Sequence, residues 1–118
     1  MTRTLVSANC IIFLIQIFVG TNTAERIITT FGYIPSRLFN PELWGYAVWE
    51  VGVTLVSSLF LHGGFVHLAG NMIYLWTFGD AVEDIFGHAR YFVFFIACGV
   101  AGSLAHTFVF PQSSIPSI

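Results

Sequence analysis

The chain has 118 residues, of which 56% are apolar, 17% aromatic and only 8% charged, and its mean hydropathy is +0.81. Values this far from those of soluble globular domains are typical of an integral membrane protein. The net charge of −2, with four Lys and Arg residues that form no cluster, leaves no basic surface for a nucleic acid. Cys10 and Cys98 lie inside apolar runs, which is typical of buried thiols and not of a disulfide framework or a metal site.

The first apolar run, residues 5–20 ("LVSANCIIFLIQIFVG"), is at the short end of what can cross a bilayer, since a membrane helix needs about 20 predominantly apolar residues. A cleaved signal peptide is the alternative, because Arg3 precedes the run and small polar residues follow it. Asn9 and Gln16 inside the apolar core, and further apolar runs downstream, favour a helix that is retained. We therefore predict the first transmembrane helix here.

Residues 21–58 form a long connection that does not span, because charged residues and chain-breaking Gly and Pro recur along it. Trp44, Tyr46 and Trp49 gather there among aliphatic residues, which is typical of a loop or short helix in the headgroup region of a bilayer. An ordinary packed loop in water fits the same residues equally well. The residues themselves leave both interpretations open.

Two further spans are predicted, over residues 65–81 and 91–110, and both are bounded by polar residues or proline. The fold class is therefore all-α, a polytopic membrane bundle of three transmembrane helices plus an interfacial loop, 21–58. Positively charged residues are divided equally between the two sides, so the charge rule for membrane topology does not orient the chain. They are Arg3 and Arg90 on one side, and Arg26 and Arg37 on the other.

Small residues recur at four-residue spacing in the third predicted span. In lipid, small side chains let the backbones of neighbouring helices approach closely, so this pattern predicts tight helix packing. Three interleaved sets follow the spacing: Ala97, Ala101 and Ala105; Cys98 and Gly102; Gly99 and Ser103.

Residues 62–71, "HGGFVHLAGN", carry three polar side chains where the second span begins: His62, His67 and Asn71. Positions four apart share one face of a helix, so His67 and Asn71 point the same way, and Tyr74 and Phe78 continue their stripe. Such side chains are costly against lipid and are expected to face protein or water. Two interpretations fit equally: hydrogen bonds that hold helices together, or a functional site inside the bundle.

A zinc site is a weak interpretation of these three residues. One class of metalloprotease places two histidines four apart on a helix with a glutamate after the first. Here His62 and His67 are five apart with glycines between them, Asn71 is a poor zinc ligand, and no Asp or Glu lies nearby. The His67 ring and the Asn71 carboxamide can instead donate hydrogen bonds to an oxyanion, although this chemistry requires a nucleophile and a base from elsewhere.

Residues 58–91, "SLFLHGGFVHLAGNMIYLWTFGDAVEDIFGHARY", resemble the signature of the rhomboid intramembrane serine proteases. This family has a His, four residues, a second His, three residues and an Asn at the start of its second core helix, matched by His62, His67 and Asn71. An aromatic-rich helix follows, then a Gly-x-x-x-Glu element and a Gly before a basic residue, matched by Gly79, Glu83, Gly87 and Arg90. The resemblance extends, more loosely, over nearly the whole chain.

The resemblance implies that His67 and Asn71 help to form an oxyanion hole and that His62 supports the architecture of the site. It implies a serine endopeptidase that hydrolyses peptide bonds in or near the transmembrane helices of protein substrates, within the lipid bilayer and without a metal or other cofactor. It also implies that the connection with Trp44 and Trp49 is partly embedded in the membrane interface. The N-terminus is then cytoplasmic.

The chain departs from the family pattern in its catalytic dyad. Rhomboids use a Ser in a Gly-x-Ser-Gly motif that opens the fourth helix and a base His on the sixth, and neither position occurs in these 118 residues. We therefore expect residues 1–118 to be a partial rhomboid domain, the N-terminal half truncated before the catalytic serine, and inactive in isolation. Ser103 and His106 are interpreted as a packing pair. Three serines without flanking glycines are interpreted as loop residues: Ser113, Ser114 and Ser117.

Two other functions fit the same residues. A catalytically inactive rhomboid-like protein would bind transmembrane clients without cutting them. A structural or transport-bundle fragment would use its polar residues only as hydrogen-bonding contacts between helices, and it would tolerate Asn71→Leu.

Overall fold

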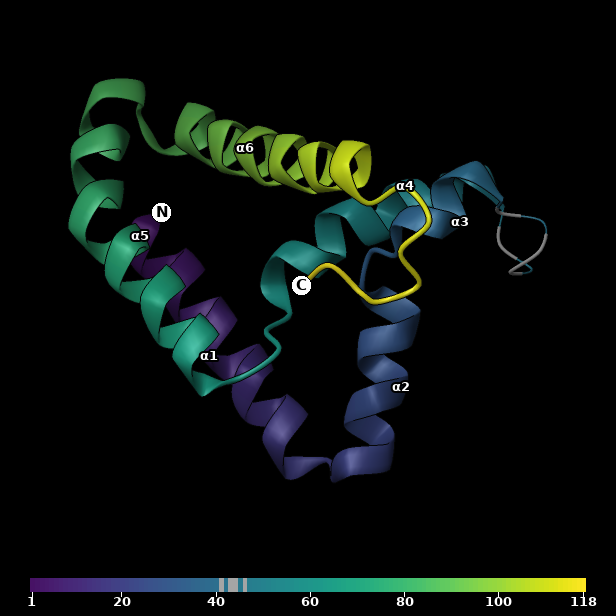
Figure 1. Cartoon of the computed structure of the whole chain (residues 1–118). Coiled ribbons are helices and arrows are strands. Elements are labelled where there is room, and N and C mark those ends of the chain that lie inside the picture. Colours follow the sequence, from purple (N-terminus) through teal and green to yellow (C-terminus); the bar gives the residue numbers. More distant parts are fainter. Residues whose placement is uncertain (41, 43–44, 46) are drawn as a thin grey trace.

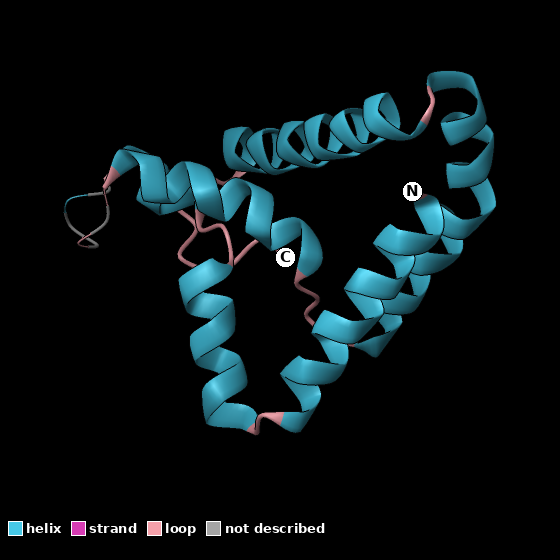
Figure 2. Cartoon of the chain, turned by 180° about the vertical axis from the view of Figure 1, so that it is seen from behind, coloured by secondary structure: helices cyan, strands magenta, loops and turns pink. Residues whose placement is uncertain are grey.

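The computed structural model describes residues 1–40, 42, 45 and 47–118 of the chain. The described part is almost entirely helical (Figure 2), and its one extended pairing is an isolated antiparallel bridge between Tyr33 and Ser117. The predicted all-α fold class is confirmed. The elements are α1 (Thr2–Phe18), α2 (Thr21–Phe31), α3 (Pro35–Phe39), α4 (Val48–Ser57), the 3₁₀ helix η2 (Ser58–Phe60), α5 (Phe65–Phe86) and α6 (His88–Val109).

The helices form an open frame with a triangular outline (Figure 1). Helices α1 and α5 lie side by side along one edge and run antiparallel, since Thr2 contacts Glu83 while Gln16 contacts His62. Helix α6 forms the second edge and α2 the third, and the view from behind shows the same arrangement (Figure 2). The α1–α5 pair is thus the part of the frame with the most continuous packing between long helices.

Helix α1 buries one stripe and exposes the rest of its surface. The buried residues recur every three or four positions, which is the spacing of a single helix face. The exposed residues of α1 include large apolar side chains such as Ile11, Leu14 and Phe18, a surface suited to lipid. Polar groups are instead collected on the inner face. The buried stripe is Thr2, Leu5, Asn9, Phe13 and Gln16.

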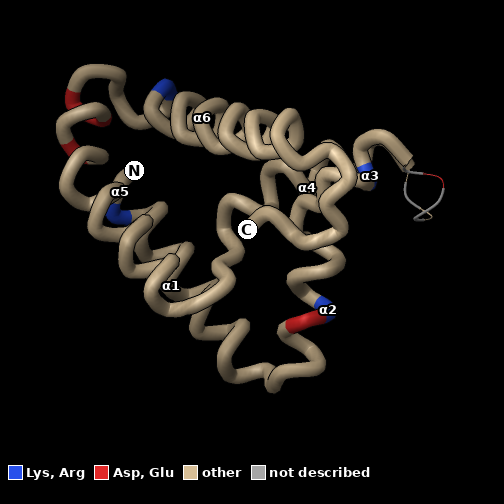
Figure 3. Tube along the Cα trace, viewed as in Figure 1, with Lys and Arg blue, Asp and Glu red and all other residues tan. Residues whose placement is uncertain are grey.

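Glu83 organises the corner where α1, α5 and α6 meet, which we call the Glu83 corner (Thr2, Gly79, Glu83, His88 and Tyr91). Its carboxylate accepts hydrogen bonds from the Thr2 backbone N–H and the Thr2 hydroxyl, both at 2.7 Å, and also contacts the Met1 amino group and the His88 ring. Figure 3 shows acidic residues gathered at this corner, while the rest of the frame carries few charges. The carboxylate therefore caps the N-terminus of a neighbouring helix.

Only one helix of the described residues, α6, is long and apolar enough by itself to cross a membrane. A second span is reached if α4 with η2 and α5 count as one broken span, although the two parts are bent by 83°. Helix α1 is apolar but has 17 residues. The prediction of three spans is not confirmed, and for α5 the polar His67, Asn71 and Asp80 provide the reason, since they lower its apolarity.

The connection predicted as an interfacial loop, residues 21–58, is largely helical. It contains α2, α3 and α4 and leads into η2. The sequence missed these helices because they are short and separated by Gly and Pro, and Pro35 in fact stands at the start of α3, where its missing N–H costs nothing. Trp49 is 70% exposed, while Trp44 and Tyr46 lie outside the described residues. An interfacial position of this segment stays a prediction.

The small residues of α6 do not all serve close packing. Gly99 does, because a Cβ atom there would lie 2.5 Å from a methyl carbon of Leu59, and Ser103 on the same face is buried. The other two predicted sets are wrong for contacts within this chain, because their side chains are exposed: Ala97, Ala101 and Ala105, and Cys98 and Gly102.

The segment after α6 folds back onto the start of α3. The Ser117 N–H donates to the Tyr33 carbonyl at 2.7 Å, and the Ser36 N–H donates to the Ser113 carbonyl at 3.0 Å. These contacts carry Ile118 to the beginning of α5, where its side chain lies 3.9 Å from the position of a Cβ on Gly63. The serines of this segment are loop residues, as predicted.

Candidate functional site

His62 occupies the short link between η2 and α5, and it is only 3% exposed. Its ring lies edge-on to Phe13 of α1, with the ring centroids 6.4 Å apart. On another side it meets the ring of His67, with the centroids 5.5 Å apart and the planes inclined by 61°. The two histidines that the sequence singled out are therefore in contact, although four residues, two of them glycines, lie between them.

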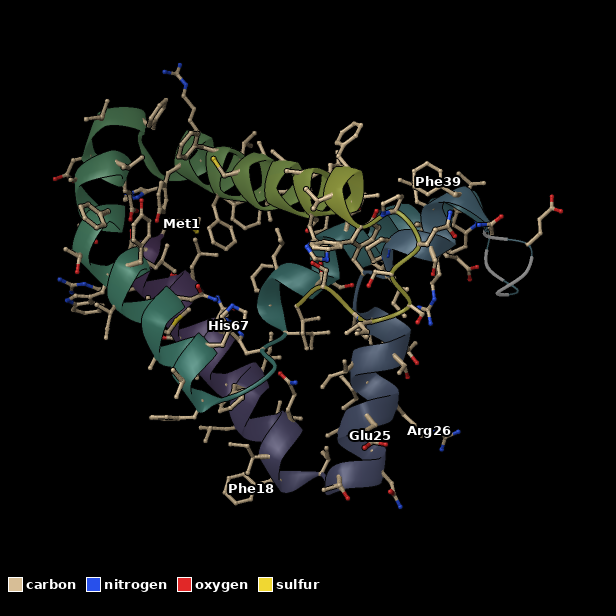
Figure 4. The ribbon with its side chains drawn as sticks, viewed as in Figure 1. Met1, Phe18, Glu25, Arg26, Phe39 and His67 are labelled. Carbon is tan, nitrogen blue, oxygen red and sulfur yellow. The ribbon has the colours of Figure 1, made fainter. Side chains whose placement is uncertain are left out.

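His67 and Asn71 lie in the first two turns of α5, and both side chains are exposed in this chain. Figure 4 shows the His67 side chain on the side of α5 that faces the link carrying His62. Asn71 lines a cavity of about 480 Å³ together with His62 and Asn9. The predicted trio is thus brought to one end of α5, with Asn71 directed into a cavity and His67 beside its buried partner.

The cavity runs along α5 between α1, η2 and α6, and most of its lining is apolar. Tyr74 and Phe78, which continue the His67–Asn71 stripe, both line it, and their ring centroids are 4.7 Å apart. The helical spacing of the stripe predicted this shared face, and the structure confirms it for Asn71, Tyr74 and Phe78.

Three of the residues that line this cavity each have a buried polar atom without a hydrogen-bond partner among the described residues. The atoms are Asn9 Oδ1, His62 Nδ1 and the Tyr91 hydroxyl oxygen. Burial lowers the pKa of the His62 imidazole below its usual value, and the neighbouring His67 lowers it further. His62 is therefore neutral at neutral pH, and its free ring nitrogen can either donate or accept one hydrogen bond.

Gln16 is a site residue whose role the sequence did not reveal. Its side chain bonds to the backbone of His62 twice: Nε2 donates to the His62 carbonyl and Oε1 accepts from the His62 N–H, each at 3.3 Å. The available signal was the pair of carboxamides in the apolar first run, because Asn9 and Gln16 are seven residues apart and so share one helix face. Their partners were not deducible from that spacing.

The remaining histidines and serines lie apart from this site. His88 joins the Glu83 corner, and the His106 ring lies against that of Phe110, with a centroid distance of 5.2 Å and the planes inclined by 45°. Ser103 is buried, and its carbonyl accepts a hydrogen bond from the Thr107 hydroxyl at 2.9 Å. Among the described residues, no three His, Cys, Asp or Glu side chains gather in a way that could hold a metal ion.

Two polar residues that line a largely apolar cavity, His62 and Asn71, and a third in contact with His62 lie between helices whose outer faces are apolar, as expected of a site inside a membrane protein. Comparison with known proteins identifies the class. Residues 47–118 match the Rhomboid domain family. Over 98 residues the chain is 35% identical to the rhomboid protease GluP of Bacillus subtilis, covering 83% of this chain and 17% of that protein.

Plant proteins give similar matches. The chain is 30% identical over 135 aligned positions to RHOMBOID-like protein 2 of Arabidopsis thaliana, which covers 94% of this chain and 42% of the plant protein. No solved structure gave a significant match. The chain belongs to the rhomboid family, whose members are integral membrane proteins. It spans less than half the length of these curated relatives.

Proposed function

We propose that this chain forms part of a rhomboid-type intramembrane serine endopeptidase, in which His67 and Asn71 stabilise the oxyanion and His62 supports the site. One observation carries the proposal: His67 touches the buried His62, and Asn71 lines the same cavity as His62. Both donors lie on α5, and the buried His62 contacts His67. Such preorganisation is what an oxyanion site needs.

The proposed reaction is the hydrolysis of a peptide bond in or near a substrate's transmembrane helix. A serine attacks the carbonyl, and water later attacks the acyl-serine, so negative charge develops twice on the same oxygen. The His67 ring and the Asn71 carboxamide each supply an N–H donor for that oxygen. The apolar lining of the cavity lowers the local dielectric on the side of the Asn71 carboxamide, which strengthens a hydrogen bond donated into the cavity.

The proposal places the nucleophile and the general base outside these 118 residues. We further propose that residues 1–118 act as one partial rhomboid domain, because α1 packs along α5 and contacts His62 through Gln16.

The proposed membrane placement is the one that the resemblance to rhomboids implies. The His62 end of the α1–α5 pair faces the outside or lumen, and the N-terminus is cytoplasmic. The exposed Trp49 on α4 supports a position of the helical connection in the membrane interface, since Trp is enriched there.

The test is a chimera in which residues 1–118 replace the matching segment of GluP, reconstituted in liposomes with a model transmembrane substrate. We expect cleavage by the chimera, and a rate about 100- to 1,000-fold lower for His67→Ala or Asn71→Ala, because each removes one oxyanion donor. Gly70→Ala is the matched control, since it lies on the same helix with open space around it. A folded His67→Ala chimera that cleaves at the unaltered rate contradicts the proposed role.

A chimera that binds the substrate helix and never cleaves it, even with the GluP nucleophile present, favours the inactive rhomboid-like alternative. Binding is measured by crosslinking of the substrate to the chimera in the same liposomes. In that outcome His67 and Asn71 are part of a client-binding surface.

A further inference from the structure

The link that carries His62 has little to hold it in place by itself. Residues 61–64 join η2 to α5 across the 83° bend, and two of the four are glycines. Glycine has the widest choice of backbone conformations, so Gly63 and Gly64 do not fix the direction of the chain. The N–H and the carbonyl of His62 also lie outside any helix, and buried backbone groups of this kind need partners.

Gln16 supplies both partners from a different helix. The carboxamide meets the His62 backbone as donor and as acceptor at once, across 46 residues of sequence. Both groups are buried, Gln16 at 6% and His62 at 3% exposure, so water does not compete for these bonds. A two-point contact fixes position and also rotation, whereas a single hydrogen bond leaves the segment free to pivot about it.

The same face of α1 also supports the His62 ring. Phe13 lies three residues before Gln16 and meets the ring edge-on, while His67 approaches the ring from α5. The backbone of His62 is therefore held by Gln16, and its ring is held between Phe13 and His67. These contacts hold both the backbone and the ring of His62, while its Nδ1 has no hydrogen-bond partner among the described residues.

We propose that Gln16 is a positioning residue for His62: its carboxamide fixes the link 61–64 so that the His62 ring, which lines the cavity, meets the His67 ring. The assignment of His62 and His67 to a catalytic site rests on the proposed function. The contact between Gln16 and His62 does not, and it is tested on the 118-residue chain without any reaction.

The experiment compares the wild-type chain with Gln16→Met in detergent micelles by NMR. Met has similar length and flexibility and fits an apolar helix, but it can neither donate to the His62 carbonyl nor accept strongly from its N–H. We expect hydrogen exchange of the His62 amide to become about tenfold faster, because a net hydrogen bond is lost. We also expect altered ring nitrogen shifts for His62 and His67, with those of His88 unchanged.

Asn9→Leu is the matched control. Asn9 stands on the same buried stripe as Gln16, but its Nδ2 donates to the Leu5 carbonyl of its own helix at 2.8 Å. Losing that carboxamide should leave His62 exchange and ring shifts unaltered. Gln16→Asn is a second test variant, since it keeps the amide but shortens its reach. It should therefore reproduce the Gln16→Met signature, including when Gln16→Met fails to fold.

The proposal is overturned if His62 exchange and ring shifts stay at their wild-type values in a helical Gln16→Met or Gln16→Asn chain. It is also overturned if Asn9→Leu produces the same changes, because the effect is then a general loosening of α1. The GluP chimera separates this inference from the proposed function. If Gln16→Met changes the His62 signals and leaves kcat intact, the positioning contact stands and the catalytic assignment of His62 fails.

Discussion

The two ends of the α1–α5 pair differ in how their ionisable side chains are paired, although the Tyr91 hydroxyl of the Glu83 corner, like His62 Nδ1, has no hydrogen-bond partner among the described residues. At the Glu83 corner, the carboxylate accepts hydrogen bonds from Thr2 and contacts His88, and close packing surrounds it. At the other end, His62 Nδ1 has no partner among the described residues, while His67 and Asn71 are exposed. Buried polar groups with satisfied bonds stabilise helix packing, whereas unsatisfied ones at a cavity mark a place for a ligand or a reaction.

Glycine shows the same contrast along α5. A Cβ atom on Gly79 would lie 2.7 Å from both the Thr2 methyl carbon and the Tyr91 hydroxyl oxygen, while one on Gly64 or Gly70 would meet nothing within 4 Å. One end of the helix therefore needs glycine for close approach, and the other leaves room. We interpret the Glu83 corner as the structural anchor of the α1–α5 pair. The opposite end, with His62, His67 and Asn71, is interpreted as the functional end, and we call it the working end.

The largest expected effect on stability comes from a larger side chain at Gly79, in the Glu83 corner. Gly79→Val should lower the free energy of unfolding by about 3 kcal/mol, because its side chain overlaps Thr2 and Tyr91 and forces the helices apart. The measurement is thermal unfolding in detergent followed by circular dichroism. Gly70→Val, on the same helix in open space, is the control and should change stability by less than about 0.5 kcal/mol. Equal losses in both variants would remove the contrast between the two ends.

The next effect isolates one hydrogen bond of the Glu83 corner. Thr2→Val keeps the shape of the side chain and removes the hydroxyl that donates to Glu83 at 2.7 Å. A hydrogen bond to a charged group contributes about 1.5–3 kcal/mol, so we expect a loss in that range. Thr4→Val, on the exposed side of the same helical turn, serves as the control. An unchanged unfolding midpoint in Thr2→Val would show that Glu83 caps α1 without need of this hydroxyl.

The sequence predicted the positions of the long helices better than the contacts between them. Apolar runs gave 65–81 and 91–110, and the structure has α5 at Phe65–Phe86 and α6 at His88–Val109. Local spacing also placed Asn71, Tyr74 and Phe78 on one face. Length and local spacing are properties of a single segment, so they can be read without knowing the fold.

Contacts between distant segments were out of reach for the same reason. Glu83 and Thr2 are 81 residues apart, and Gln16 and His62 are 46 apart, so no local pattern links them. The sequence showed only that these polar residues sit in apolar surroundings. Which of them satisfy each other depends on the packing of α1 against α5, and the packing also decides that Ala97, Ala101 and Ala105 face outward.

A smaller effect on stability is expected when the pH is lowered, because of His62. Burial lowers the pKa of His62 below its usual 6.5, so the folded chain disfavours the protonated ring. As the pH falls below about 6.5, the unfolded chain takes up a proton that folded His62 does not, and stability decreases by at most about 1.4 kcal/mol per pH unit. We expect the melting temperature to fall between about pH 6.5 and 5.5. In His62→Phe this fall should be reduced, and an equal fall there would assign it to another group.

The smallest expected change in stability belongs to Asn71. Its side chain is exposed, so Asn71→Leu should alter the free energy of unfolding of the chain by less than about 0.5 kcal/mol. In the GluP chimera the same substitution should still lower the cleavage rate about 100-fold or more, because it removes an oxyanion donor. Unfolding is measured in detergent and cleavage in liposomes, with Gly70→Val as the control in both.

This pair of measurements separates a site residue from a packing contact more sharply than either alone. When a polar residue that joins helices is replaced by an apolar one, the protein loses stability and activity together. Replacement of an exposed residue of the working end, such as Asn71, lowers activity alone, since no hydrogen bond within the described residues depends on its side chain. A large loss of stability in Asn71→Leu would instead place Asn71 with Thr2 and Glu83 as a structural contact between helices, and the two ends would then not differ in this respect.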